Sequence, residues 1–341
     1  MFEAVVLICL NAGAGPCREM LLPGFEADNQ QACEAALAEA PPQTPAGTAA
    51  FCQPKGAALA VDEIAEGVFV HSGLIEEPDE VNLGDVSNLG FVIGDASVAV
   101  IDSGSARWMG EALWRSIRQR TDKPVSHVIL THMHPDHVFG ATLFADAGAE
   151  LVGHERLPRA LADRQANYLE SLHRLIGEEA MIGTVSPDIS HRIGAEDQID
   201  LGNRVLTLTA WPTAHTPADL TVFDTKSGTL FAGDLVFDQH TPALDGSVLG
   251  WQDVMARMKA QAALRVVPGH GAASLPWPAG TAALERYLQT LVTDTRAAIA
   301  DGTRLGDAVK TIAADEAEHW HLFEAYNPRN ATVAFTELEW E

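Results

Sequence analysis

Short apolar runs rich in β-branched residues alternate along most of the chain with longer segments of helical periodicity. The strand-like runs occupy residues 68–71, 91–93, 97–101, 128–130, 150–153 and 205–208, with more short strands between 189 and 231. Helical periodicity marks residues 108–120, 138–147, 155–182, 251–263, 280–300 and 305–340. Strands and helices that interleave in this way predict an α/β protein built in layers.

The pattern is different before residue 59. An alanine-rich segment with acidic residues, 28–40, predicts a helix, and the proline-rich stretch 41–47 ends it. We therefore expect residues 16–58 to form a small N-terminal extension and linker, and residues 59–341 to form one larger catalytic domain.

Residues 1–15 resemble a signal peptide in part. An apolar run, 5–10, precedes the small residues 12–14, but Glu3 stands where a basic residue is usual. We expect a signal peptide over residues 1–15 and a periplasmic or secreted protein. The alternative is a buried first strand in a cytoplasmic protein. No other stretch approaches the roughly 18 apolar residues of a membrane span, so we expect no integral membrane segment in the mature chain.

All four cysteines lie in the first 52 residues: Cys9, Cys17, Cys33 and Cys52. If Cys9 leaves with a signal peptide, one pair can form among the other three, and the sequence leaves that pairing open. Any metal site in the larger domain must therefore use nitrogen and oxygen ligands.

Composition narrows the choice of partners. The chain has 341 residues, 47% of them hydrophobic, and a formal net charge of −25. Such acidity repels phosphate backbones and anionic lipid, so we expect no nucleic-acid partner and instead a small-molecule substrate.

The segment from His132 to His137 concentrates metal-binding chemistry. His132, His134, Asp136 and His137 follow directly on the predicted strand 128–130. Imidazole and carboxylate are regular zinc ligands, and a loop at a strand end can direct them toward one or two ions. A His-rich surface loop is the alternative, but it would not need so many ligand types together.

Three more candidate ligands lie near the ends of later strands: His215, Asp234 and His270. Alone, each histidine could be an ordinary polar residue and the aspartate could cap a turn. In open α/β sheets, however, sites gather beyond strand ends. We therefore expect these three to join the 132–137 cluster.

These residues resemble the metal motif of the metallo-β-lactamase superfamily, with Asp102 matching an earlier aspartate of that family. The resemblance covers roughly residues 60–341 and implies an αβ/βα sandwich. It also implies two zinc ions, or iron or manganese in their place. Their implied ligands are His132, His134 and His215 for the first ion, Asp136, His137 and His270 for the second, and Asp234 for both.

The resemblance further implies a hydrolase that uses a metal-bound hydroxide on an ester, thioester or amide/lactam-type bond. Asp136 is then the catalytic residue that orients the nucleophile, and Asp102 holds a ligand loop in place. A bridging aspartate resembles the glyoxalase II type of site. Lactamases of the superfamily usually lack it, which disfavours lactams as the main substrate.

A closer resemblance is to the quinoprotein relay system zinc metallohydrolases. It rests on the cysteine-bearing extension, segment 210–235, loop 242–251 and the stretch 327–332. It implies a periplasmic protein linked to pyrroloquinoline-quinone (PQQ) dehydrogenase pathways, with a quinoprotein or cytochrome partner. Because loop 238–250 follows Asp234, we expect His240 and Trp251 to line the substrate pocket. Alternatively, the loop closes over the core with Trp251 packed inside.

Two other functions remain open on the same scaffold. One is an iron-dependent oxidoreductase of the persulfide dioxygenase type, although mononuclear iron dioxygenases use fewer ligands than this chain offers. The other is a non-catalytic metal-binding partner in a quinoprotein pathway, which would not need both Asp136 and Asp234.

Overall fold

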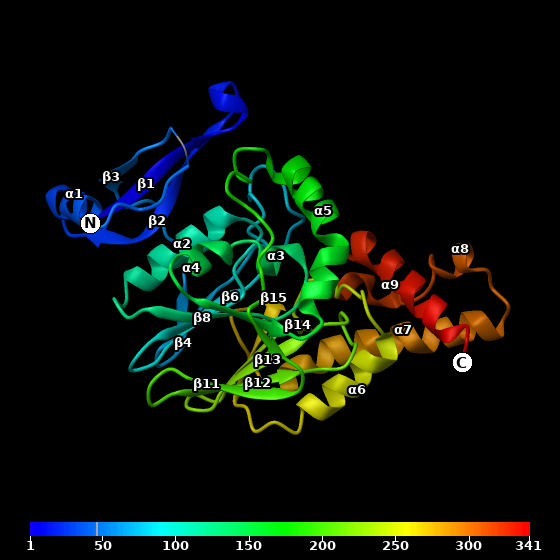
Figure 1. Ribbon diagram of the computed structural model, residues 1–341. Helices are drawn as coiled ribbons and strands as arrows, with labels where there is room; N and C mark the ends of the chain where they lie inside the picture. Colours follow the sequence, from blue (N-terminus) through cyan, green and yellow to red (C-terminus); the bar gives the residue numbers. More distant parts are fainter. Residues whose placement is uncertain (46) are drawn as a thin grey trace.

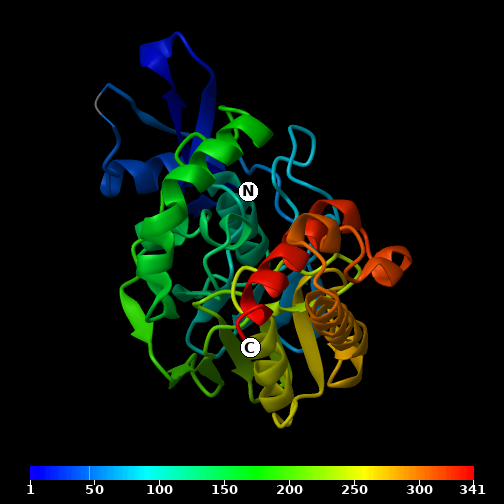
Figure 2. The same ribbon diagram turned by 90° about the vertical axis from the view of Figure 1, so that its right-hand side faces the viewer.

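Two β-sheets face each other in the body of the molecule, and helices cover their outer faces (Figures 1 and 2). The computed structural model describes residues 1–45 and 47–341, so Ala46, within the predicted linker, lies outside the described residues. The arrangement is the expected αβ/βα sandwich, with an additional small unit near the N-terminus.

The first large sheet has strand order β10-β9-β8-β7-β6-β5-β4. Its strands are β4 (Asp62–Ala65), β5 (Val68–His71), β6 (Leu89–Ile93), β7 (Val98–Ile101), β8 (Val125–Leu130), β9 (Glu150–His154) and β10 (His191–Ile193). Strands β7, β8, β9 and β10 pair in parallel, and their central members are buried on both faces. This burial explains why they read as continuous apolar runs.

The second large sheet has strand order β11-β12-β13-β14-β15-β16. Its strands are β11 (Glu196–Asp200), β12 (Val205–Ala210), β13 (Leu220–Asp224), β14 (Thr229–Phe237), β15 (Arg265–His270) and β16 (Leu275–Pro276). An apolar layer fills the space between the sheets, with Val92 and Ile129 from the first sheet clustered with Leu208 and Val222 from the second. Burial of this layer holds the two halves together.

Helices of each half pack on the outer face of that half's sheet. The α-helices are α1 (Gln30–Glu39), α2 (Arg107–Arg118), α3 (Pro135–Val138), α4 (Thr142–Asp146), α5 (Leu157–Ile176), α6 (Val248–Met258), α7 (Ala282–Ala300), α8 (Leu305–Ala308) and α9 (Phe323–Leu338). Short 3₁₀ helices are η1 (Asn11–Gly13), η2 (Ala279–Thr281) and η3 (Ala314–His319). Helices α2, α4 and α5 share a core with the first sheet, and α6, α7 and α9 share one with the second. In the described part of the chain, no helix combines the length and apolarity that crossing a membrane requires.

The N-terminal unit is a three-stranded antiparallel sheet in the order β2-β1-β3, with α1 packed on it (Figure 1). Its strands are β1 (Phe2–Cys9), β2 (Cys17–Ala27) and β3 (Ala50–Pro54). Two disulfides close it, Cys9–Cys17 and Cys33–Cys52, which settles the pairing that the sequence left open. Strand β1, the central strand of this unit, lies within residues 1–15.

Several predicted element boundaries need correction. The segment 138–147 is divided between α3 and α4, the helix expected over 155–182 ends at Ile176, and that expected over 305–340 is divided into α8, η3 and α9. Breaks in the last segment occur at Ala313 and Leu322, whose φ angles of 56° and 61° lie in the left-handed region and cannot continue a helix. Strands β2 and β3 were not predicted.

Candidate metal centre

All seven predicted ligands meet at one edge of the two sheets. His132 and His134 lie on the loop after β8, Asp136 and His137 lie in α3, and His270 ends β15. His215 lies between β12 and β13. Asp234 lies within β14, rather than just past a strand, at a register irregularity of the β14–β15 pair. Residues far apart in sequence therefore form one cluster at adjoining strand ends.

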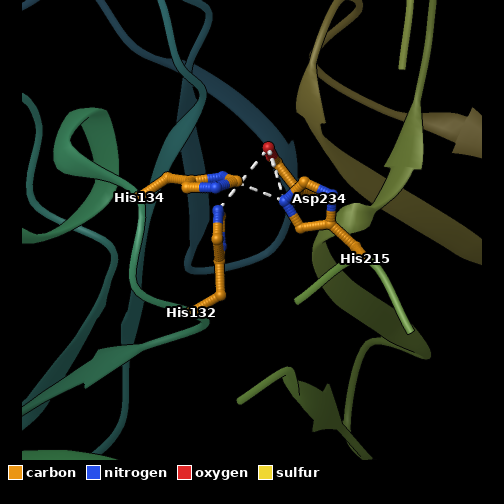
Figure 3. A group of neighbouring side chains, drawn as sticks. All are labelled: His132, His134, His215 and Asp234. Carbon is orange, nitrogen blue, oxygen red and sulfur yellow. Dashed lines mark hydrogen bonds and ion pairs between the residues drawn. The ribbon is translucent and has the colours of Figure 1, made fainter. Parts of the chain in front are cut away.

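The first ligand group consists of His132, His134, His215 and Asp234, whose ligand atoms all lie within 4.8 Å of one another. Figure 3 shows the four side chains converging from opposite sides of the site. His215 Nε2 lies 3.0 Å from His134 Nδ1 and 3.4 Å from Asp234 Oδ2. Three imidazoles and a carboxylate at this spacing suit a single tetrahedral zinc ion.

The second ligand group consists of Asp136, His137 and His270. Asp136 Oδ2 lies 3.4 Å from His137 Nε2 and 3.3 Å from His270 Nε2. Asp234 also reaches this group, because its Oδ1 lies 3.2 Å from His137 Nε2. Its carboxylate thus lies between the two groups, as a bridging ligand would.

Three buried polar atoms at the centre of the two ligand groups indicate whether a cation would fit there. His132 Nε2, His137 Nε2 and Asp234 Oδ1 are buried and have no hydrogen-bond partner among the described residues. Buried polar atoms are rarely left unpaired. Metal ions held between the facing nitrogen and oxygen atoms would satisfy all three.

The second ring nitrogen of each histidine is already engaged. His137 Nδ1 lies 2.8 Å from Asp102 Oδ2, His270 Nδ1 lies 2.8 Å from the Val86 carbonyl oxygen, and His132 Nδ1 lies 3.0 Å from Thr131 Oγ1. His215 Nδ1 faces the Ala243 carbonyl oxygen, and His134 Nε2 lies 3.3 Å from Asp245 Oδ2. A histidine that donates from one nitrogen keeps the other as a lone-pair ligand, so all five are pre-oriented for metal.

Asp102 occupies the position expected of a residue that holds a ligand loop. Its carboxylate accepts hydrogen bonds from the Thr131 backbone N–H and hydroxyl, both at 2.8 Å, as well as from His137. Thr131 in turn contacts His132. One buried carboxylate therefore orients a histidine from each ligand group.

Protonation states in the cluster follow from burial and charge. Burial lowers the pKa of His215 to about 3 and holds the pKa of His132 well below its usual value, so both are neutral. Burial alone would raise the pKa of Asp136, but the neighbouring His137 and His270 hold it below its usual value. Burial alone would lower the pKa of His137 and His270, but the neighbouring Asp136 and Asp234 raise it above its usual value. Because neutral imidazole and ionised carboxylate are the forms that bind metal, these two histidines must lose a proton when metal binds.

A cavity of about 460 Å³ is lined by members of both ligand groups, His134, Asp136, Asp234 and His270, and we call the polar surface that they form its floor. His240 also lines this cavity. Trp251 does not: it is fully buried, its ring centroid lies 5.2 Å from that of His215, and its indole N–H donates to the Leu235 carbonyl. This corrects the expectation for Trp251, which fills the core behind the site.

Sequence reasoning missed several residues of the cavity. Asp245 accepts a bidentate pair of hydrogen bonds from Arg164, at 2.6 and 2.9 Å, in addition to its contact with His134. Tyr168, Tyr326 and Arg329 are further polar residues of the walls. The available signals were the position of Asp245 in the loop after Asp234 and the family resemblance of the stretch 327–332, since α5 reaches the site through tertiary packing alone.

Comparison with known proteins gives a family match, a related sequence and similar solved structures. Residues 83–270, more than half of the chain, match the family described as Metallo-beta-lactamase superfamily. The Bacillus subtilis (strain 168) protein described as uncharacterized protein YobT is 31% identical over 114 residues. That match covers 33% of this chain and 46% of YobT, so the chain spans less than half the length of this relative.

Solved structures share the architecture. A metallo-beta-lactamase from Pontibacter korlensis superposes with a TM-score of 0.55 at 21% identity, covering 68% of this chain and 99% of that chain. A double mutant of the sec-alkyl sulfatase PisA1 superposes with a TM-score of 0.64 at 13% identity, covering 83% of this chain and 51% of that chain. At these identities the likeness shows the fold alone.

Proposed function

The chain belongs to the metallo-beta-lactamase superfamily, and from that premise we propose that it is a dinuclear zinc-dependent hydrolase of ester, thioester or amide bonds. The observation that carries the proposal is the cluster of five histidines and two aspartates, with buried atoms left unpaired, at the floor of a cavity. Metal ions bound there would polarise the substrate carbonyl and lower the pKa of water.

Asp136 is the residue we propose to act on the nucleophile. Its carboxylate lines the cavity floor between His137 and His270 and stays ionised. There it can accept a hydrogen bond from the attacking water and orient it toward the substrate. The Asp136 side chain is 15% exposed, so it can reach a water in the cavity while most of its surface is shielded from solvent.

The cavity favours a small organic substrate with an apolar portion. Pro78, Leu172, Leu244 and Val333 line its walls above the polar floor. Its volume of about 460 Å³ lies in the range of small-molecule sites. The bridging position of Asp234 supports esters and thioesters over lactams as the main substrates.

Elemental analysis tests this proposal first, on protein purified without chelators or affinity-resin metal. We expect about two zinc ions per chain and hydrolysis of members of an ester, thioester, lactone and lactam screen. His132→Ala and Asp136→Ala should each lower the rate by more than about 100-fold. Unchanged hydrolysis in either variant would refute the mechanism. Iron in place of zinc would favour the oxidoreductase alternative, because histidine and carboxylate ligands accept both metals.

We also propose that the protein is exported and acts beside a quinoprotein dehydrogenase or its cytochrome. Two disulfides in the N-terminal unit support an oxidising compartment, where such bonds persist. The resemblance of the extension and of segments 242–251 and 327–332 to quinoprotein relay hydrolases supports the pathway. Cell fractionation with thiol trapping is the test: disulfide-bonded protein in the periplasmic fraction is expected, and reduced protein in the cytoplasm would contradict export.

A further inference from the structure

The metal-facing histidines are held in place from two different parts of the chain. In the second ligand group, His137 is oriented by Asp102 and His270 by the Val86 carbonyl, each at 2.8 Å. Both supports belong to the first sheet and the loops around it. Nothing in these contacts involves the C-terminal helices.

In the first ligand group, two of the four ligands depend on residues 240–247, which we call the support loop. His215 Nδ1 donates to the Ala243 carbonyl, and His134 Nε2 contacts Asp245. The support loop also bonds back to the segment that carries His215, since the Asp245 N–H donates to the His215 carbonyl at 2.9 Å. The position of this loop therefore sets the orientation of both rings.

Asn330 of α9 fixes the support loop. Its Oδ1 accepts a hydrogen bond from the Leu244 N–H at 2.9 Å, and its Nδ2 donates to the Pro242 carbonyl at 2.5 Å and to the Tyr287 hydroxyl at 2.7 Å. The Asn330 side chain is 1% exposed. One amide thus bonds to two backbone groups on either side of Ala243.

Two further contacts join the same C-terminal segment to the support loop. The His321 carbonyl accepts from the Thr241 N–H at 3.0 Å and from its hydroxyl at 2.7 Å. The Glu337 carboxylate accepts from the Ser247 hydroxyl at 2.6 Å and from the Val248 N–H at 2.7 Å, at the start of α6. Asn330 bonds to the part of the loop between these two attachments, next to the residues that contact His134 and His215.

From this arrangement we infer that Asn330 is a positioning residue for the first ligand group, which sets that group's metal affinity without touching the metal. Removing its side chain leaves the buried Leu244 N–H and Pro242 carbonyl unpaired, so the loop must shift to find new partners. That shift moves the acceptors of His134 and His215 and leaves those of His137 and His270 in place. The inference rests on the proposed function only in requiring that the two groups bind metal.

The experiment is a competition titration of metal-free protein with Zn²⁺ and a chromophoric chelator, repeated with Co²⁺ to record spectra. In Asn330→Ala, we expect one metal equivalent to bind about 10–100-fold more weakly and the other to bind as in the unchanged protein. His134→Ala lacks a ligand of the first group and His270→Ala lacks a ligand of the second. Their Co²⁺ spectra therefore show which absorption bands belong to each group, and we expect the weakened equivalent to be that of the first group.

Asn327→Ala is the matched control. Asn327 is also a buried asparagine of α9, and it bonds to the Tyr287 hydroxyl and the Ile312 carbonyl, each at 2.9 Å, but not to the support loop. Both metal equivalents should therefore keep their affinity in this variant. If Asn330→Ala fails to fold, Asn330→Gln keeps both the acceptor and the donor of the amide, displaced by one methylene, and should weaken the same equivalent by less.

The position of the support loop is tested further by a double-mutant cycle. If Asn330 acts through Asp245, the double variant should lose less affinity for the first metal equivalent than the sum of the losses in Asn330→Ala and Asp245→Ala. Any of three results would overturn this inference alone. Folded Asn330→Ala could bind both metal equivalents with unchanged affinity, it could bind both more weakly to the same extent, or Asn327→Ala could show the same weakening as Asn330→Ala. Failure of the unchanged protein to bind Zn²⁺ or Co²⁺ would instead overturn the proposed function, and this inference with it.

Discussion

Asp102 is a residue on which both ligand groups depend. Its φ of 58° lies in the left-handed region, which aspartate and asparagine tolerate better than most side chains. Asp102→Asn therefore keeps the backbone favourable while removing either the acceptor that His137 shares with the Thr131 hydroxyl or the acceptor of the Thr131 N–H. We expect zinc affinity to fall by about 10–100-fold, measured by chelator competition.

Asp146→Asn is a suitable control for this change, because Asp146 is an exposed carboxylate that pairs with Arg107 at 2.8 Å and lies outside the metal cluster. It should leave zinc affinity unchanged. Equal affinity in Asp102→Asn and the unchanged protein would show that the ligand histidines are oriented without Asp102.

His71 and Asp85 form a pair at the base of the 72–85 loop, away from the metal ligands. His71 Nδ1 lies 2.8 Å from the Ala60 carbonyl and Nε2 lies 2.7 Å from Asp85. Burial alone would lower the pKa of His71, but Asp85 and the carbonyl raise it above its usual value. Because the folded pKa exceeds the unfolded value, the pair stabilises the fold fully below about pH 6.5 and less as pH rises through the folded pKa.

Asp85→Asn should therefore lower the free energy of unfolding of metal-free protein by about 1.5–3 kcal/mol at pH 6. At pH 9 the gap between variant and unchanged protein should narrow, because His71 is then neutral in both. Urea unfolding at the two pH values measures this difference. A gap of the same size at both would mean that His71 carries no charge at pH 6.

At the scale of elements, the N-terminal unit is joined to α2 by buried ion pairs. Glu111 is 2% exposed and accepts from Arg18 at 2.6 Å, with Arg107 Nε 3.4 Å away. Replacing Glu111 by Ala leaves the buried Arg107 and the half-buried Arg18 without this partner. We expect unfolding free energy to fall by about 3–5 kcal/mol in urea denaturation.

Asp307→Ala is the control for the stability loss in Glu111→Ala, because Asp307 forms an exposed ion pair with Lys310 at 2.9 Å. Such a pair contributes about 0–1 kcal/mol. If both variants lose equally little stability, the N-terminal unit is not held by its ion pairs.

The elements also show what the sequence could and could not predict. The gathering of the seven candidate ligands was predictable because four of them lie within residues 132–137 and the other three lie in or after apolar runs. The support from Asp245 and Asn330 was not, because it depends on how α9 packs against a loop nearly 90 positions earlier. Strand β2 escaped prediction because Pro23 and Gly24 interrupt its pattern. The break before α9 was not predicted because residues 313–319 favour a helix locally. In the structure, however, Leu322 adopts a left-handed conformation that ends the helical run.

At the scale of the whole molecule, the metal cluster joins the two sheets. His132 and His137 belong to the first half and His215 and His270 to the second, so ions between them would link the halves. Removing metal with a chelator should lower the melting temperature, and adding Zn²⁺ should restore it. Free Zn²⁺ at about 1,000 times its Kd would raise the free energy of unfolding by about 4 kcal/mol.

Mg²⁺ at the same ionic strength serves as the control, because it prefers oxygen ligands and should not restore the melting temperature. Equal restoration by Mg²⁺ would indicate simple screening of a chain with net charge −25. No change with either ion would show that metal binding does not help to hold the two halves together.

The attachment of the support loop to α9 has a consequence for the order of events during synthesis. A nascent chain that has emerged as far as His270 already carries all seven ligand side chains, yet His321, Asn330 and Glu337 have still to be made. Until they are, the acceptors behind His134 and His215 are not fixed in position. The proposed role of Asn330 therefore implies that the first ligand group is completed only after the last helix has been translated, whereas the supports of His137 and His270 are made earlier.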